Sequence, residues 1–254
     1  MATSEVLSKP VNGTIKITKM GYSGPDSDGD YSFNQMEAVI DNDSEDTIEL
    51  VKHSCFFLDA DGTCLGGQYD TEEEVYIESR ESGNLTNMWT NLSGVHLAKD
   101  AEITALMDCV AYKRAFKKLG VISPPSSHKE HTSLTEQIKS FAGLLDIHGV
   151  ICTREKPDED SGDVGLTLRV GVRNKSDEYI DRVEIKAQLL DQEDSEIDSS
   201  SDYNAMAPHT SRIFEPSFWG CKAGKLRNAT IKVSIAIFIP VSDYTASAVA
   251  VKDD

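Results

Sequence analysis

The sequence predicts an all-β protein made of two tandem antiparallel β-sandwiches that are related by internal duplication. Two observations lead to this prediction. A segment of the chain recurs 132 positions later, and apolar residues alternate with polar ones over strand-length stretches. Neighbouring side chains of a strand point to opposite faces, so an apolar period of two indicates a strand with one buried face. The length of 254 residues suits two domains of ordinary size.

The repeat is clearest around two asparagines. The segment 42–51 aligns with the segment 174–183, and both have Asn, Ser, Ile and Val in the same places. The same spacing places Leu58-Asp59 on Leu190-Asp191. Further along the chain the spacing becomes shorter, which we attribute to shorter loops in the second copy, because loops tolerate deletions.

The alternation of apolar and polar residues is most regular in the second copy. Turns rich in Asn, Asp, Gly and Ser separate these stretches, and this pattern favours an antiparallel sandwich. Trp89 and Trp219 occur once in each copy, and we expect each to fill the core of its own sandwich. The expected core-facing residues of three strands are Leu166, Leu168, Val170 and Val172, then Val183, Ile185, Ala187 and Leu189, then Ile231, Val233, Ile235, Ile237 and Ile239.

A change of pattern separates the copies. The stretch 123–127 reads Ser-Pro-Pro-Ser-Ser, which is a stiff and polar break. Beyond it, apolar residues recur at helical spacing, with Ser133 as the N-cap and Gly143 near the end, which predicts a short amphipathic helix. Its apolar residues are Leu134, Ile138, Phe141 and Leu145. The expected organisation is a first sandwich at 1–122, a linker with the helix at 123–146 and a second sandwich at 147–254.

The composition excludes several classes of protein. The chain has 25 Lys and Arg against 43 Asp and Glu, a formal charge of −18, which argues against binding nucleic acid or anionic membranes. No stretch approaches the ~18 apolar residues of a membrane span, and residues 1–20 have no signal-peptide run. The five cysteines are scattered without CxxC spacing. We therefore expect reduced thiols and a cytoplasmic protein.

The first copy carries a motif-like run of residues. An Asn-x-Ser turn at 42–44 precedes a strand with Ile48 and Val51, and the run Phe-Phe-Leu-Asp-Ala-Asp-Gly follows at 56–62. This order resembles the FxLYD-type immunoglobulin-like domains, although the Tyr of that pattern is absent because Leu58 is followed directly by Asp59. The resemblance implies two immunoglobulin-like folds of about seven strands, typical of binding or spacer modules. It implies no catalytic residues.

Two aspartate clusters occupy the same loop in both copies. Calcium prefers several carboxylate and carbonyl oxygens that converge, and alternate aspartates on a tight loop supply such oxygens. Asp and Gly are also the ordinary residues of hairpin turns, so both interpretations stay open. The third acidic stretch, 191–198, is expected to be a solvated loop. The calcium candidates are Asp26, Asp28, Asp30, Asp158, Asp160 and Asp163.

His53 and Cys55 fall on inward positions of one predicted strand, aligned with Ile185 and Ala187. Zinc accepts such nitrogen and sulfur ligands, but two further ligands are needed and the spacing indicates none. We therefore expect both side chains to fill the core.

A local reversal of charge ends the first copy. Four cations occur within six residues of an otherwise acidic chain, either as a solvated strand end or as a docking patch for an acidic partner. These residues are Lys113, Arg114, Lys117 and Lys118.

No motif of catalysis or phosphate binding occurs in the sequence, so we expect no enzyme and no cofactor. The leading hypothesis is a protein-interaction or scaffolding module. It would bind a partner protein or a second copy of itself through sandwich edges and loops, because exposed edges recruit strands. The alternative is a calcium- or ligand-binding module that uses the acidic loops at 26–30 and 158–163.

Overall fold

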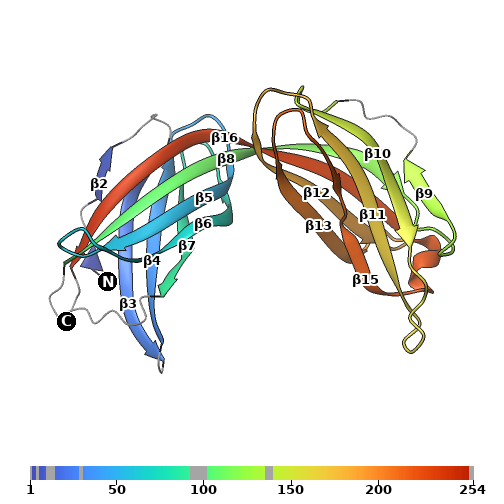
Figure 1. Ribbon diagram of the computed structural model, residues 1–254, viewed down its shortest axis with the longest axis horizontal. Coiled ribbons are helices and arrows are strands. Elements are labelled where there is room, and N and C mark those ends of the chain that lie inside the picture. Colours follow the sequence, from blue (N-terminus) through green and yellow to red (C-terminus); the bar gives the residue numbers. More distant parts are fainter. Residues whose placement is uncertain are drawn as a thin grey trace. The chain divides into compact units, whose positions relative to one another are not determined.

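The structure, a computed structural model, is built almost entirely from β-strands (Figure 1). It describes residues 2–3, 6–9, 15–28, 31–91, 102–134 and 140–251, with the side chains of 38–85, 106–134 and 140–241. Within these ranges, the strand pairs whose register is described are antiparallel. The helical structure of the same ranges consists of one 3₁₀ turn, η1, at Lys225–Asn228. The predicted all-β antiparallel class is therefore confirmed.

The chain forms two compact units. Unit 1 contains Met1–Arg114 and Pro240–Asp254, and unit 2 contains Ala115–Ile239. The chain passes between them inside two long strands, β8 (Glu102–Ile122) and β16 (Thr230–Val251), and each of these contributes residues to both units. The expected ranges 1–122, 123–146 and 147–254 differ from these units because β16 is long enough to return the end of the chain to unit 1.

The strands of unit 1 pair in two groups. In the first group, β1 (Ala2–Thr3), β3 (Ile15–Asp28), β4 (Tyr31–Asn42) and β7 (Ser82–Asn91) pair in that order. In the second, β6 (Cys64–Ile77) pairs with β5 (Ile48–Leu58), and β5 pairs with β8. β2 (Val6–Lys9) pairs with the last part of β16.

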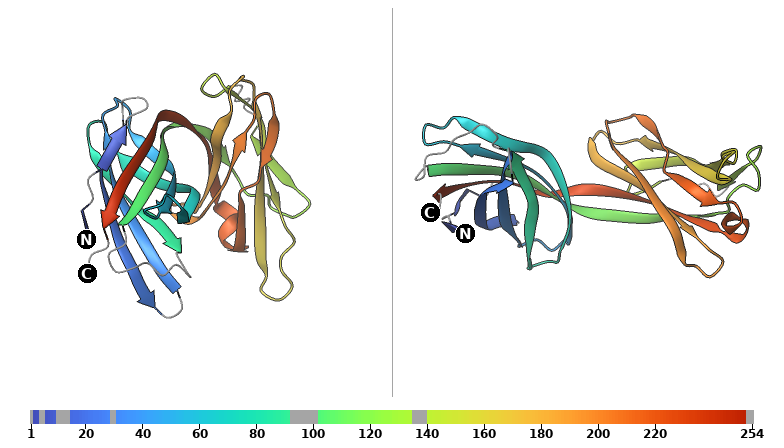
Figure 2. Two further views of the ribbon diagram at one scale, coloured as in Figure 1. Left: turned by 60° about the vertical axis from the view of Figure 1, so that its left-hand side comes forward. Right: turned by 90° about the horizontal axis from the view of Figure 1, so that it is seen from below.

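The strands of unit 2 repeat this arrangement, as Figures 1 and 2 show from three sides. In the first group, β9 (His131–Leu134), β10 (Leu145–Arg154) and β11 (Asp163–Asn174) are followed by β14 (Ser211–Phe214) and β15 (Ser217–Lys222), which both pair with β11. In the second group, β12 (Ile180–Leu190) lies between β13 (Glu196–Met206) and β16.

The repeat in the sequence is thus a repeat of strand order. β4 and β11 each have 12 residues, β5 and β12 each have 11, and both pairs of strands begin 132 positions apart. The pairings of β4 with β3 and β7 recur as those of β11 with β10, β14 and β15. The pairings of β5 with β6 and β8 recur as those of β12 with β13 and β16.

A fully buried asparagine ends β4. The Nδ2 group of Asn42 donates hydrogen bonds to the carbonyl oxygens of Asp46, Ile77 and Glu78, at 2.8, 3.1 and 3.0 Å. Its Oδ1 atom accepts hydrogen bonds from the backbone nitrogen and the hydroxyl of Ser44, at 3.0 and 2.6 Å. One side chain therefore joins the turn before β5 to the end of β6, and its buried polar atoms are satisfied.

Asn174 makes the same bonds at the end of β11. Its Nδ2 group donates to the carbonyl oxygens of Glu178, Met206 and Ala207, at 2.8, 3.3 and 3.2 Å. Its Oδ1 atom accepts from the backbone nitrogen and the hydroxyl of Ser176, at 3.0 and 2.7 Å. The recurring Asn-x-Ser of the sequence is therefore a recurring hydrogen-bond network.

The core of unit 2 joins the inward side chains of both strand groups. Val170 on β11 and Val183 on β12 are both fully buried, and they belong to one apolar cluster with residues of β10 and β16. The predicted period of two is thus confirmed along β11, where buried residues alternate with less buried ones from Leu166 onward.

Trp219 does not fill this core, which corrects the prediction for the second copy. Its side chain is 66% exposed, and the neighbouring Phe218 is buried instead. The register of β15 against β11 shifts between Val164 and Leu166, so that Phe218 and Cys221 both face inward while Trp219 lies in the irregular segment between them. The side chain of Trp89 lies outside the described residues.

The predicted linker helix is also wrong where the structure describes it. Leu134 lies in β9 and Leu145 begins β10, and Phe141 forms an isolated bridge with Leu145. Between these two residues, Ala142 and Gly143 have φ angles of 52° and 72°, which an α-helix does not allow. Residues 135–139, including Ile138, lie outside the described residues. Phe141 and Leu145 are buried and Leu134 is half-buried, without a helix to place them.

A tight turn also recurs in both units. The Oδ1 atom of Asp59 accepts the backbone N–H groups of Asp61 and Thr63, at 2.9 and 2.8 Å. That of Asp191 accepts those of Glu193 and Ser195, at 2.8 and 2.9 Å. The left-handed position of the turn, with φ of 80° in unit 1 and 62° in unit 2, is occupied by Gly62 and by Asp194, respectively.

We expect Asn174→Asp to lower the free energy of unfolding by about 3 kcal/mol, because a buried acceptor that loses its donor costs about 1–3 kcal/mol. The variant has nearly the same shape but presents a carboxylate to three carbonyl oxygens. Thermal and urea unfolding followed by circular dichroism measure the change. The matched control is Asn228→Asp on the exposed surface, which should change stability by less than about 0.5 kcal/mol. Equal effects of both substitutions would contradict the role of Asn174.

We expect Gly62→Ala to destabilise the protein by about 1–2 kcal/mol, since a side chain in the left-handed region costs about that much. Gly224→Ala is the control. An added Cβ atom at either glycine meets no atom within 4 Å, but Gly224 has a φ of −66°. Chemical denaturation of both variants separates backbone strain from crowding. A Gly224→Ala variant that loses as much stability would refute the strain at Gly62.

Candidate functional site

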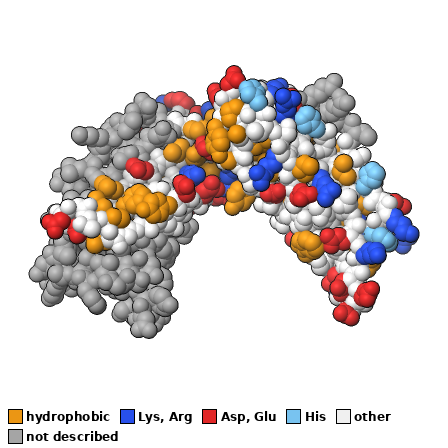
Figure 3. Space-filling view, in the orientation of Figure 1, with side chains coloured by type: hydrophobic (Ala, Val, Ile, Leu, Met, Phe, Trp, Pro, Cys, Tyr) orange, Lys and Arg blue, Asp and Glu red, His pale blue; other side chains and the backbone are white. Residues whose placement is uncertain are grey.

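A group of acidic side chains of unit 2 lies at the tip of the β10–β11 hairpin (Figure 3). The Oδ1 atom of Asp158 accepts hydrogen bonds from the backbone nitrogens of Asp160 and Ser161 and from the Ser161 hydroxyl, at 3.2, 2.8 and 2.9 Å. These bonds lower the pKa of the exposed Asp158 carboxyl. Asp163 forms an ion pair with Lys222. The Asp158 carboxylate thus closes the hairpin turn, and the Asp163 carboxylate joins the hairpin to β15.

Asp160 lies in the same turn, and the other three calcium candidates belong to unit 1. Asp26 and Asp28 lie in β3, but their side chains, like all of Asp30, lie outside the described residues. In the described part of the chain, no three His, Cys, Asp or Glu side chains are grouped as a metal ion requires. Calcium binding by the acidic loops stays a prediction.

The four predicted docking cations alternate along β8. Lys113 and Lys117 belong to the row that includes the buried Met107, Ala111 and Leu119, and Arg114 and Lys118 belong to the opposite row. The Lys113 ammonium pairs with Asp46 at 2.9 Å, and the Lys117 ammonium donates to the carbonyl oxygen of Ser140 at 2.9 Å. Lys118 is exposed. Because of this alternation, the four cations do not share one face of the strand.

His53 and Cys55 point into the core of unit 1, as the sequence predicted. His53 is 1% exposed and neither ring nitrogen has a hydrogen-bond partner. Its Nε2 atom lies 3.8 Å from Oε2 of Glu73 on β6, and Cys109 of β8 is its opposite neighbour in the sheet. The loss of water around the ring lowers the pKa of His53 to about 4, and burial raises that of Cys55 to about 12. Both side chains are therefore uncharged at neutral pH.

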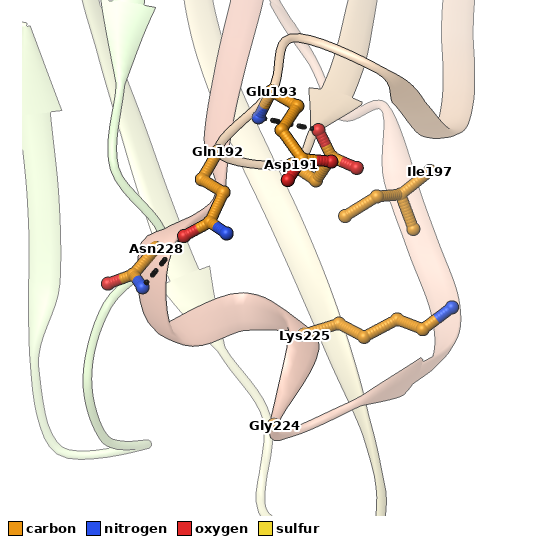
Figure 4. Close-up of a pocket in the computed structure, with 7 residues that line it drawn as sticks. All are labelled: Asp191, Gln192, Glu193, Ile197, Gly224, Lys225 and Asn228. Atoms are coloured by element: carbon orange, nitrogen blue, oxygen red, sulfur yellow. Dashed lines mark hydrogen bonds between the residues drawn. The ribbon is translucent and has the colours of Figure 1, made fainter.

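A small open pocket lies in unit 2 between the Asp191 turn and η1 (Figure 4). It has a volume of about 330 Å³. Glu193 and Lys225 enter it from opposite sides, and the Asn228 amide donates to Oε1 of Gln192 at 3.4 Å across one wall. Ile197 is its one large apolar side chain. These groups are exposed or half-buried, so the pocket has little apolar surface with which to enclose a ligand.

The edge of the second sheet in unit 1 offers a longer binding surface. β6 has 14 residues and ends the sheet, with β5 as its paired neighbour among the described strands. It carries two large exposed aromatic side chains, Tyr69 and Tyr76, at 69% and 70% exposure. An edge strand of this length presents a row of backbone N–H and C=O groups to another chain.

Two adjacent glycines precede Tyr69 in β6. Gly66 and Gly67 lie in β6, and the ring of Phe56 covers Gly67, where an added Cβ atom would lie 3.0 Å from the ring and 2.5 Å from the carbonyl oxygen of Cys55. Phe56 contacts Tyr69 edge to face, with ring centroids 4.8 Å apart. Figure 3 shows hydrophobic side chains gathered over β5 in this part of unit 1. Glycine within a strand often marks a close approach of another backbone, and at Gly67 that backbone is β5.

The equivalent edge in unit 2 is partly occupied. Two side chains of β13 accept backbone N–H groups, one from the segment between β14 and β15 and one from the first residue of β15. Ser200 accepts from Ser217 at 3.0 Å, and Asp202 accepts from Glu215 at 2.7 Å. The β6 edge was not among the sequence predictions. The adjacent glycines beside Tyr69, in a stretch without proline, were the available signal.

Comparisons with known proteins identify no family for this chain. No family matches it, and no curated protein matches its sequence. Among solved structures, the one named pT26-6p aligns over 96% of this chain and 64% of its own, with 7% identity and a TM-score of 0.25. Red sea bream transglutaminase aligns over 81% and 28%, with 9% identity and a TM-score of 0.22. The enzymatically active domain of tailspike protein 4 of bacteriophage CBA120 aligns over 45% and 20%, with 12% identity and a TM-score of 0.17.

The chain spans less than two thirds of each of these three structures. Their TM-scores are too low to indicate a shared fold, so we transfer no property from them. Among the residues that the structure describes, no helix has the length and apolar character needed to cross a membrane.

We expect acid to destabilise the protein through His53. Its pKa is about 4 in the folded chain and about 6.5 when unfolded, so the unfolded state binds more protons between these values. Stability is therefore complete above pH 6.5 and falls by up to about 3 kcal/mol as the pH decreases to 4. His53→Leu should remove this part of the pH dependence, because Ile185 shows that an aliphatic side chain fits the equivalent site.

Urea unfolding at several pH values between 4 and 7.5 measures this effect. The control is His128→Leu, at an exposed position outside the strands, which should leave the pH profile unchanged. An unaltered profile for His53→Leu would contradict the assignment.

Proposed function

We propose that this chain is a non-enzymatic protein-interaction module that binds another protein at the β6 edge of unit 1. We further propose that each unit is an immunoglobulin-like sandwich. The strand order supports this second proposal, because the central pairings of β4 and β5 place β3 and β7 in one sheet and β6 and β8 in the other. Immunoglobulin domains divide their strands between two sheets in a comparable way.

The observation that carries the proposed function is the combination of exposed aromatic rings with a strand edge that pairs with no further strand among those the structure describes. Backbone groups of an edge strand supply affinity for any extended segment, and neighbouring side chains supply selectivity. Tyrosine is favoured at protein interfaces because it offers a large and stiff contact with a polar end. β6 has both features within one element, at Gly66-Gly67 and at Tyr69 and Tyr76.

The edge also has features that limit unspecific pairing. The register of β6 against β5 shifts at three places, and Asp70 has a φ of 49° at one of these bulges. Bulges and charged side chains on edge strands reduce random association between sheets. The edge is therefore suited to a partner of matching shape and charge.

We expect a photoreactive residue placed at Tyr69 or Tyr76 to form a covalent adduct with a protein of the native host upon illumination. Adducts are detected as a shift in a gel and identified by mass spectrometry. Trp219 is the control, because it is similarly exposed but lies in unit 2. The proposal is wrong if neither tyrosine position yields an adduct, or if Trp219 yields the same one with equal efficiency.

A further inference from the structure

We propose that unit 2 has a binding site of its own, on the outer face of its first group of strands, and that the ligand is a neutral sugar ring with equatorial hydroxyls. Trp219 of β15 is the platform on which the sugar ring lies, and Glu155, the residue after β10, binds its hydroxyls. This inference does not depend on the proposed function, because it concerns other strands and another class of ligand.

Trp219 presents its indole ring to solvent from an irregular place in β15. The register of β15 against β11 shifts here, so that Trp219 and Gly220 both lie opposite Gly165. Gly220 has a φ of 67°, in the left-handed region that glycine adopts without strain. The tryptophan is 66% exposed, and it has no hydrogen-bond or ring partner among the described residues. A large apolar ring is therefore available to a ligand.

On the other side of β11 from Trp219, the Glu155 carboxylate covers Gly165. The backbone nitrogen of Glu155 donates to the carbonyl oxygen of Gly165 at 2.9 Å. Val164 and Leu166 are buried in the core, so Gly165 between them faces outward. A Cβ atom added to Gly165 would lie 2.6 Å from Oε2 of Glu155. The carboxylate thus takes the place of the missing side chain, and a single glycine separates it from Trp219 in the sheet.

The Glu155 carboxylate is free to bind a ligand. The residue is exposed, and its side chain has no hydrogen-bond or ion-pair partner in the part of the chain that the structure describes. An ionised carboxylate accepts hydrogen bonds through both of its oxygens. An O–H group that donates to such an oxygen forms a short and strong charge-assisted bond. The outer face therefore has a strong acceptor for hydroxyl groups close to an exposed ring.

Polar side chains continue the same face on both sides of Trp219. On one side, the ammonium of the exposed Lys222 pairs with Asp163 at 2.5 Å. On the other side, the hydroxyls of Thr167 and Ser217 are hydrogen-bonded at 3.2 Å. Hydroxyls both donate and accept hydrogen bonds, and an ammonium donates them. The ring is thus bordered by groups that bind hydroxyls.

A sugar ring with equatorial hydroxyls matches this arrangement. Its axial C–H groups form an apolar face with a partial positive charge, and the face of an indole ring carries a partial negative charge. Its hydroxyls lie around the rim of the ring, where they reach a neighbouring carboxylate. A sugar that carries a carboxylate of its own would be repelled by Glu155. The site therefore favours neutral sugars over acidic ones.

Two other ligands stack on aromatic rings but match this face less well. Proline-rich peptides bind in grooves lined by several aromatic side chains. The five strands of this face, all of which the structure describes, have one exposed residue among their Phe, Tyr and Trp, which is Trp219. A cationic ligand would be repelled by Lys222 and would leave the hydroxyls of Thr167 and Ser217 unused. Because an open platform encloses little of its ligand, we expect a Kd for the sugar on the order of 1 mM.

The probes are cellohexaose, maltohexaose and chitohexaose, each with a matched form in which C6 is oxidised to a carboxylate. The indole N–H resonances of the full-length chain, which has two tryptophans, report binding by NMR, and Trp219→Phe identifies the resonance of Trp219. We expect at least one neutral hexasaccharide to shift this resonance to saturation. Its oxidised form should bind at least about tenfold more weakly, because like charges repel.

Variants are compared by saturation transfer to the protons of the sugar, which needs no indole. Trp219→Ala should abolish the transfer. Glu155→Gln should weaken binding by about tenfold, because it replaces charge-assisted bonds by neutral ones. Gly165→Ala should also weaken it, since the added methyl group displaces the carboxylate. Tyr179→Ala is the matched control, because this ring of unit 2 is 59% exposed and it should leave binding unchanged. Circular dichroism confirms that each variant is folded.

Several results would overturn the inference. The site is wrong if no neutral hexasaccharide shifts the Trp219 resonance at about 10 mM, well above the expected Kd. It is also wrong if Tyr179→Ala weakens binding as much as Trp219→Ala does, if Glu155→Gln binds as tightly as the unaltered chain, or if the oxidised sugars bind as well as the neutral ones. A shift caused by decaproline or tetramethylammonium, and by none of the sugars, would assign the ring to a peptide or a cation and reject the sugar. None of these results affects the proposal for β6.

Discussion

Each unit depends on one fully buried asparagine that closes the turn between its two groups of strands. Asn42 and Asn174 end β4 and β11, and each side chain bonds three carbonyl oxygens and the following serine. An amide is the side chain that supplies donors and an acceptor together, which is what a turn with unpaired groups of both kinds requires. This network fixes where β5 and β12 begin. The first residue of each strand determines which of its side chains point inward, and these side chains form the cores.

The sequence predicted those features that are written in local patterns. The Asn-x-Ser repeat, the alternation along β11 and along β12 from Ile185 onward to Leu189, and the inward positions of His53 and Cys55 depend on neighbouring residues alone, and the structure has them. The predictions were wrong where residues far apart in the sequence determine the local structure. Leu134, Phe141 and Leu145 have helical spacing but are held by β10 and by a left-handed turn at Ala142. Trp219 is exposed because a register shift places Phe218 inward, and the course of β16 through both units depends on pairings that no local pattern encodes.

The two copies share strand order but differ in what they bury and expose. Where unit 2 has Ile185 and Ile235 in its core, unit 1 has His53 and Cys109, with Glu73 nearby. Polar groups in a core cost stability unless they are satisfied, so this difference makes unit 1 the more sensitive of the two to acid. Unit 1 also carries the edge with adjacent glycines and exposed tyrosines. We therefore place the proposed binding surface on unit 1, whereas the β13 edge of unit 2 is engaged by Glu215 and Ser217.

The exchange of the side-chain amide protons of Asn42 and Asn174 with solvent, followed by NMR, tests the buried network most directly. If each amide is held by carbonyl oxygens inside its unit, these protons should exchange at least about a hundredfold more slowly than those of the exposed Asn228, because exchange then requires the unit to open. Exchange of Asn42 and Asn174 at the same rate as Asn228 would show that the turns are open in solution and would contradict the account of both units.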